Sequence, residues 1–287
     1  MVNRTPLLYL GLVCIACGGP NDETLVDELR VLSIITEPPE VAPGDDYTFQ
    51  HLTHIPSGTA AERLTWTCTF DGTRCVESEV ASRIDEWVHI TEPNGVELQS
   101  QERMVPNSFA AALSEELPQL QIPLWTLACT PGLCPIVDAV RSAPEPDTEA
   151  WQALSEALAN PFSWLSEYPK NGVSLATKNI TVSLNPPEQR NVNPVITREA
   201  TESIVVPRDD SVALTFTVTD EDPLTTFGYT TIGGFESTRD SAVSGPVVQT
   251  LFAPTDEPPT DSGTIYIIAN DARGGSAVWT QSFTLSE

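Results

Sequence analysis

Ser211–Thr219, SVALTFTVT, is the stretch of sequence that decides the fold. Its apolar residues Val212, Leu214, Phe216 and Val218 alternate with small or polar residues. Because successive side chains of a strand point to opposite faces, this alternation predicts a β-strand with one face in a core and the other in solvent. Such a half-buried strand is typical of a β-sandwich.

The rest of the C-terminal third continues this pattern. Short β-rich segments are separated by Gly, Pro and Asp, with no cysteine and no convincing helix. Short strands at this spacing predict a β-sandwich, which we place at residues 195–287. Its further strand candidates are residues 203–206, 227–232, 247–252, 264–269 and 277–285.

A linker at residues 185–194, NPPEQRNVNP, separates this domain from a longer one. The longer domain, residues 29–184, opens with a β-rich segment at 29–36 and closes with an alternating one at 172–184. We expect it to be a second β-sandwich. Its inner strand candidates are residues 47–53, 64–70 and 87–97.

Between these strands the apolar period changes. Four residues fall at helical spacing, and residues 148–158 make the best helix candidate of the chain. We therefore expect a helical insertion in the first domain, at about residues 107–168. The residues at helical spacing are Phe109, Leu113, Leu117 and Leu120.

Several stretches resemble immunoglobulin-like modules of secreted and surface proteins of bacteria. In the first domain these are the strand and Pro/Gly turn at 29–44, together with Trp66 beside Cys68. The second domain resembles cadherin-like modules. This resemblance implies a mainly β chain of two immunoglobulin-like β-sandwich domains. The cadherin-like stretches are residues 193–195, 216–223 and 269–276.

The N-terminus resembles that of a bacterial lipoprotein. An apolar run at residues 6–16 suits a signal peptide and is too short to span a bilayer as a helix. Ile15-Ala16-Cys17-Gly18 resembles a lipobox, although Cys14 stands where leucine is usual. The resemblance implies a signal peptide at 1–16, a diacylglycerol on Cys17 and an acidic tether at 17–28. The alternative is a plain secretory peptide cut after Ala16.

The same resemblance implies a location. Gly18 stands where an aspartate would retain a lipoprotein in the inner membrane. We therefore expect the chain in the outer membrane of a Gram-negative bacterium, facing the periplasm or the cell surface. The layout also resembles two-domain lipoproteins of myxobacteria-like organisms, a family of uncharacterised function, which supports the architecture and implies no activity.

The charge balance excludes one class of partner. The chain holds 40 acidic residues against 14 Lys and Arg, a net charge of −26. Such a surface repels phosphate backbones, which argues against nucleic acid. It also repels anionic lipids, so the membrane contact must come from the N-terminal lipid. Adaptation to a salty medium is the simplest alternative explanation of the charge.

Four cysteines remain after the export segment, and an even number in an exported protein indicates two disulfides. Three pairings are possible. We favour Cys68–Cys75 and Cys129–Cys134, because each pair closes a short loop that holds turn residues. A zinc site is the weaker alternative, because neither spacing is C-x-x-C.

The sequence offers little for catalysis. It has three histidines and none of the common hydrolase or phosphate-binding motifs. His51 and His54 could suggest a metal, but residues three apart on a strand point to opposite faces. We therefore expect no enzyme and no certain cofactor. The tryptophans are better explained by core packing; Trp87 has the most polar surroundings.

Three functions follow from this. We favour a surface lipoprotein that acts as a structural, adhesion or protein-binding module, with an envelope protein or a polysaccharide as its partner. A carbohydrate-binding lipoprotein would need exposed aromatic residues on one sheet face. An envelope hydrolase would need a cleft beside the helical insertion.

One metal site is suggested by the second domain. Asp220 and Asp222 end one strand, Asp271 ends another, and Asn193 lies in the linker. In cadherin-like modules the matching residues hold calcium, which prefers carboxylate and carbonyl oxygens. Asp and Asn are also what β-turns demand, and the sequence alone slightly favours that simpler interpretation.

Overall fold

The computed structural model describes most of the two domains. Among the residues that it describes, the regular elements are β-strands and three short 3-10 helices, η1 (Asp22–Thr24), η2 (Asn107–Ala111) and η3 (Pro187–Gln189). The expectation of a mainly β chain is confirmed. Among the described residues, no helix has the length and hydrophobicity needed to cross a membrane. The described residues are 22–56, 59–67, 69–70, 75–76, 83–90, 101–105, 107–115, 117–133, 172–199, 202–242 and 244–287.

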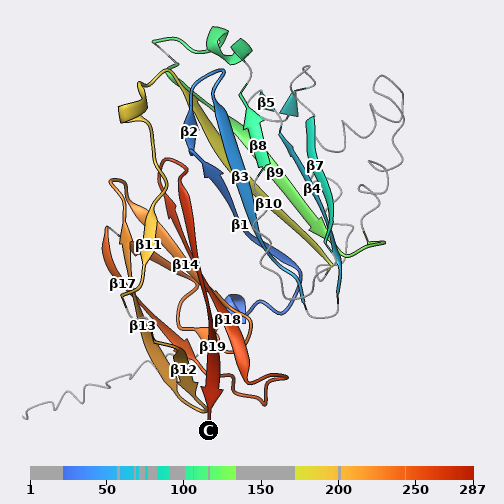
Figure 1. Ribbon diagram of the computed structural model, residues 1–287, viewed down its shortest axis with the longest axis vertical. Helices are drawn as coiled ribbons and strands as arrows, with labels where there is room; N and C mark the ends of the chain where they lie inside the picture. Colours follow the sequence, from blue (N-terminus) through green and yellow to red (C-terminus); the bar gives the residue numbers. More distant parts are fainter. Residues whose placement is uncertain are drawn as a thin grey trace, which may run out of the picture.

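The first domain is a sandwich of two sheets (Figure 1). Its core lies between them and is built from aromatic and aliphatic side chains such as Phe49, Leu124 and Ile180, all fully buried. A small ribbon of β5 (Thr69–Phe70) and β6 (Cys75–Val76) stands apart. One sheet has the order β1 (Arg30–Glu37), β3 (Asp46–His54), β8 (Gln101–Met104), and the other β2 (Glu40–Val41), β10 (Val173–Ser183), β9 (Gln119–Cys129), β4 (Ala61–Thr67), β7 (Arg83–Ile90).

The second domain is also a sandwich. Its alternating stretch at Ser211–Thr219 forms a strand, as predicted. β13 spans Ser211–Thr219, with Leu214, Phe216 and Val218 buried in the core. One sheet has the order β11 (Val195–Thr197), β13, β17 (Gly245–Phe252), β15 (Gly234–Phe235), and the other β12 (Ile204–Pro207), β19 (Ser276–Ser286), β18 (Ser262–Asp271), β14 (Leu224–Thr230), β16 (Arg239–Ala242).

The two domains share one topology. In each, the first strand pairs antiparallel in one sheet, and the chain then crosses to pair parallel with the last strand of the other sheet. In the first domain β1 pairs with β3 and β2 with β10; in the second, β11 pairs with β13 and β12 with β19. The crossing covers one edge of both sheets, and we identify both domains as immunoglobulin-like sandwiches.

The expected helical insertion at about 107–168 is wrong for the part that the structure describes. There, η2 is a single 3-10 segment and β9 is an inner strand of the five-stranded sheet. Eight consecutive residues of β9 are buried, so the strand reads as an apolar run without alternation. Pro118 and Pro123 also oppose a helix. The helix candidate at 148–158 lies outside the described residues.

The domains pack face to face near their boundary. Leu52 of β3 forms a buried cluster with Tyr266 and Ile268 of β18. Half-buried apolar side chains from both domains pack around this cluster, so the contact has an apolar centre. Figure 1 shows the β1–β3 sheet lying against the β14–β18–β19 sheet. The surrounding side chains are Leu32, Phe227, Tyr229 and Val278.

The N-terminal segment joins the second domain before it enters the first. Phe235 N–H donates to Thr24 Oγ1 at 2.8 Å, and Val26 N–H donates to the Thr230 carbonyl oxygen at 2.8 Å. Thr24, Val26 and Leu29 are buried. Thr24 and Val26, within the expected tether at 17–28, are therefore part of the fold, and residues 17–21 lie outside the described part of the chain.

Candidate functional site

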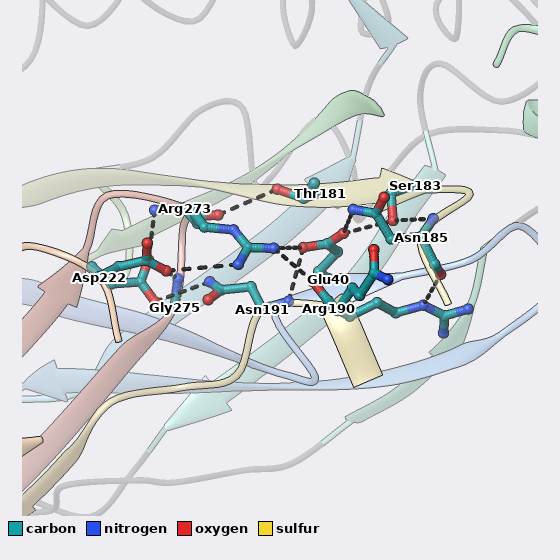
Figure 2. Close-up of polar contacts among 11 residues, drawn as sticks. Glu40, Thr181, Ser183, Asn185, Arg190, Asn191, Asp222, Arg273 and Gly275 are labelled. Carbon is teal, nitrogen blue, oxygen red and sulfur yellow. Dashed lines mark hydrogen bonds and ion pairs between the residues drawn. The ribbon is translucent and has the colours of Figure 1, made fainter. Parts of the chain in front are cut away.

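The turn between β18 and β19, residues 271–276, reaches from the second domain to the first (Figure 2). Arg273 Nη2 donates to Glu40 Oε2 at 2.7 Å. Thr181 Oγ1 donates to the Arg273 carbonyl oxygen at 3.4 Å, and Lys178 Nζ donates to Ser276 Oγ at 2.5 Å. Residues far apart in the sequence thus meet in one polar cluster, which we call the junction cluster.

Glu40 is the centre of the junction cluster and is only 1% exposed. Its Oε1 accepts hydrogen bonds from Ser183 Oγ at 2.6 Å and Asn185 Nδ2 at 2.8 Å. Its Oε2 accepts from the Asn191 backbone N–H at 2.9 Å and from Arg273. Burial raises the pKa of Glu40, but these hydrogen bonds and the Arg273 charge outweigh burial and hold the pKa below its usual value.

Asp271 organises the turn itself. Its Oδ1 accepts from the backbone N–H groups of Arg273 at 2.8 Å and Gly275 at 2.7 Å, and its Oδ2 accepts from Asn191 Nδ2 at 2.9 Å. Glycine is required at 275, because a Cβ there would collide with the Asp271 carboxylate and lie 2.9 Å from the Val192 carbonyl oxygen. The turn therefore packs directly against the linker at Asn191 and Val192, with no space for a side chain at position 275.

Three of the four residues predicted to bind calcium come together beside this turn. One carboxylate oxygen from each of Asp220, Asp222 and Asp271 lies within 4.8 Å of the others. Asp220 Oδ1 accepts from Asp222 N–H at 2.7 Å, while Asp220 Oδ2 is buried and has no hydrogen-bond partner among the described residues. Burial, with the negative charges of Asp271 and Asp222, raises the pKa of Asp220.

The fourth residue, Asn193, has another role. Its Nδ2 donates to the Thr36 carbonyl oxygen at 2.7 Å and to Glu37 Oε2 at 2.5 Å. Its Oδ1 accepts from Ser276 N–H at 2.8 Å. Asn193 thus ties the linker to both domains, with two hydrogen bonds donated by Nδ2 and one accepted by Oδ1.

Two cations partly offset the acidic cluster. Arg273 Nη1 lies 3.8 Å from Asp222 Oδ2. Burial lowers the pKa of Lys178 to about 8, and the nearby Asp271 charge opposes this shift. Calcium takes six to eight oxygen ligands, so the three carboxylates would supply part of a site.

His51 and His54 do not converge on a metal site in the described part of the chain. His51 is buried in the first domain, with Nε2 2.8 Å from Thr126 Oγ1, and burial, with Arg63 nearby, lowers the pKa of His51 to about 3. His54 packs instead against the Tyr266 ring of the second domain, 6.4 Å between centroids. The pair points to opposite faces, as the strand periodicity predicts.

Two of the tryptophans occupy the core of the first domain, as expected. Trp66 and Trp125 are buried and stacked, with ring centroids 6.3 Å apart. Trp279, in the second domain, is half-buried and packs edge-on against Phe216. Trp87 lies in β7; Trp151 and Trp164 lie outside the described residues.

The cysteine predictions are only partly covered by the structure. Cys129 is buried at the end of β9, and Cys75 lies in β6. Cys17, Cys68 and Cys134 lie outside the described residues, so both the lipidation and the pairing stay predictions.

Sequence reasoning missed most of the junction cluster. From the sequence, Glu40 falls in a Pro/Gly turn and Lys178 in an alternating strand, and neither pattern predicts a contact with Arg273. The available signal was Lys178, a charged residue within an alternating β-rich segment, where lysine is uncommon.

The chain was compared with known proteins. No protein-family model and no curated protein matches it. Among solved structures, the SrpA adhesin from Streptococcus sanguinis is 18% identical over 35% of this chain and 60% of that one, with a TM-score of 0.28. A chimeric titin Z1Z2 tandem is 12% identical over 93% of this chain and 100% of that one, with a TM-score of 0.30.

Protocadherin gamma B2 cadherin domains 1–5 are 10% identical over 91% of this chain and 41% of that one, with a TM-score of 0.24. The chain spans less than two thirds of the length of the adhesin structure. The strand order and pairing of both domains identify them as immunoglobulin-like sandwiches.

Proposed function

We propose that the chain is a non-enzymatic structural or adhesion module of the cell envelope, whose two sandwiches act as one rigid unit. The observation that carries this proposal is the junction cluster around Glu40. A carboxylate that is 1% exposed receives four hydrogen bonds, one of them from the other domain. Separating the domains would leave this buried charge without Arg273, which is costly.

Rigidity supports an adhesion role in a direct way. A binding surface that spans two domains is pre-organised when the domains are locked, so less entropy is lost on binding. The apolar cluster of Leu52, Tyr266 and Ile268 acts in the same direction. Flexible tandem domains usually have small, polar contacts between them.

We further propose that Cys17 carries a lipid that anchors this unit in the outer membrane. The lipobox-like sequence supports this part of the proposal. Two or three acyl chains anchor a protein stably, because each buried methylene contributes ~0.8 kcal/mol. The partner would then be another envelope protein or a polysaccharide.

The anchor is tested by expressing the full chain with Cys17→Ser and separating membrane from soluble material. The wild type should partition into detergent with an acylated N-terminus, and the variant should not. Cys14→Ser is the matched control and should behave as wild type. An acylated, membrane-bound Cys17→Ser variant would overturn the anchor. Cross-linking on intact cells with mass spectrometry then identifies the partner.

A second candidate is calcium binding by Asp220, Asp222 and Asp271. It is favoured by the convergence of the three carboxylates and by the buried Asp220 Oδ2 without a partner among the described residues. A bound cation would relieve the repulsion between the carboxylates. The hydrolase alternative depended on a helical insertion, and the described part of that segment is strand β9.

A further inference from the structure

A hollow of about 490 Å³ lies where the two domains and the N-terminal segment meet. Its distinguishing feature is a pair of arginines, each placed over an aromatic ring. Arg30 comes from the first domain and Arg239 from the second, so the hollow is complete only when the domains are packed together. Its lining residues are Glu23, Arg30, Phe227, Tyr229, Thr238 and Arg239.

The geometry of the arginines is well defined. Arg30 Cζ lies 5.2 Å from the centre of the Tyr229 ring, and Arg239 Cζ lies 6.0 Å from the centre of the Phe227 ring. Arg239 is also the strand partner of Phe227. Stacking on an aromatic face orients a guanidinium while its N–H groups stay available at the edge.

These two arginines differ from three other arginines that the structure describes. Arg190, Arg208 and Arg273 each form an ion pair with a carboxylate. Neither Arg30 nor Arg239 has a carboxylate within 4.0 Å among the residues that the structure places. The Glu23 carboxylate also lines the hollow, so two arginines against one acid leave it with a net positive charge, in a chain with 40 acidic residues against 14 basic ones.

We propose that this hollow binds a carboxylate-bearing sugar unit of an acidic polysaccharide. Guanidinium groups bind carboxylates through two parallel hydrogen bonds. The Thr238 hydroxyl offers a partner for a sugar hydroxyl, and Phe227 and Tyr229 offer apolar edges for ring carbons. The volume lies within the usual range for small-ligand sites, which form preferentially at domain interfaces.

The net charge of the chain does not prevent this binding. Charges farther away than ~8 Å are largely screened at physiological ionic strength, so the ligand's carboxylate responds mainly to the groups that line the hollow, where two arginines outweigh Glu23. The ligand class adds to the proposed adhesion function. It does not depend on the lipid anchor, because the test below measures binding in solution.

The test is calorimetry of the full chain, purified in detergent, with digalacturonate as the probe and EDTA present to remove divalent cations. We expect the acid to bind and its methyl ester, which keeps the ring but loses the charge, to bind at least tenfold more weakly. Arg30→Gln and Arg239→Gln should each weaken binding about tenfold, or 1.4 kcal/mol. Their melting temperatures, measured in parallel, show whether they are folded.

Arg208→Gln is the matched control, because Arg208 is an arginine outside this hollow that is paired with Asp261. It should leave digalacturonate affinity unchanged. Equal affinity for the acid and its ester, or no binding at millimolar concentration, would overturn the proposal. Equal competition by acetate would also overturn it, by showing a simple anion site. If digalacturonate does not bind but Cys17→Ser loses its membrane attachment as expected, the sugar-binding proposal is wrong and the proposed envelope function is unaffected.

Discussion

Glu40 of the first domain and Arg273 of the second form an ion pair with 2.7 Å between Oε2 and Nη2, although they are 233 residues apart in the sequence. The carboxylate is almost fully buried, whereas the Arg273 side chain is 38% exposed. The contact therefore depends strongly on the two domains keeping their relative position.

Arg273→Met should lower the free energy of unfolding by roughly 1–3 kcal/mol, because it leaves a buried carboxylate without its charged partner. The check is urea unfolding of the full chain. Arg208→Met is the control: both members of the Arg208–Asp261 pair are exposed, so the change should stay below about 1 kcal/mol. Equal effects of the two variants would contradict the central role of Glu40.

Stability should rise with pH through the titration of Lys178. The folded pKa of Lys178 is lowered to about 8 from 10.5 by burial, so between these values the unfolded chain binds more protons. The free energy of unfolding then increases with pH in that window. Urea unfolding at several pH values should show this rise in the wild type and a flatter profile in Lys178→Met. The same rise in both chains would exclude Lys178 as its source.

Calcium should raise the melting temperature of the full chain if the acidic cluster binds it. Asp220→Asn and Asp271→Asn should each remove most of the increase, because each supplies one of the three converging carboxylates. Asp256→Asn, an exposed aspartate elsewhere in the second domain, is the control. A wild-type melting temperature that is the same in millimolar calcium and in EDTA would end this candidate.

The strand register makes a specific prediction about the disulfides. In the pairing of β4 with β9, Glu62 lies opposite Cys129 and Thr67 lies opposite Leu124. Leu124 is five residues from Cys129, so Thr67 is about 17 Å from Cys129 along the strand direction. Cys68 follows Thr67 and is at most ~3.8 Å nearer, whereas bridged cysteines have Cα atoms within ~7 Å. Peptide mapping without reduction should recover Cys129 with Cys134. Recovery of Cys129 with Cys68 would contradict the register.

Alternating strands could be predicted from the sequence, and strands buried along their length could not. β13 spans the predicted residues because its core face and its outer face have different compositions. β9 was missed because residues 122–129 are all buried, which removes the alternation. The spacing of the apolar residues from 109 to 120 then suggested one face of a helix. In the structure Phe109 and Leu113 are buried, but Leu117 is 52% exposed, so these residues do not share one buried face.

The acidic cluster was predictable in part for a clear reason. Asp220 and Asp222 share one turn, and Asp271 is the strand partner of Leu224, which follows that turn. Because these two strands are neighbours, the residues at their adjacent ends, Asp220, Asp222 and Asp271, lie close together. The partners of Glu40 lie more than 140 residues along the chain, and no local pattern reports contacts of that kind.

The attachment of Thr24 and Val26 to the second domain determines how the molecule would carry mechanical load. Tension applied at the N-terminus reaches the second domain at Thr230 and Phe235 before it reaches Arg30, where β1 begins. The two sandwiches are then pulled in parallel, and the linker at 185–194 is spared most of the stress. Under shear the molecule should respond as one block.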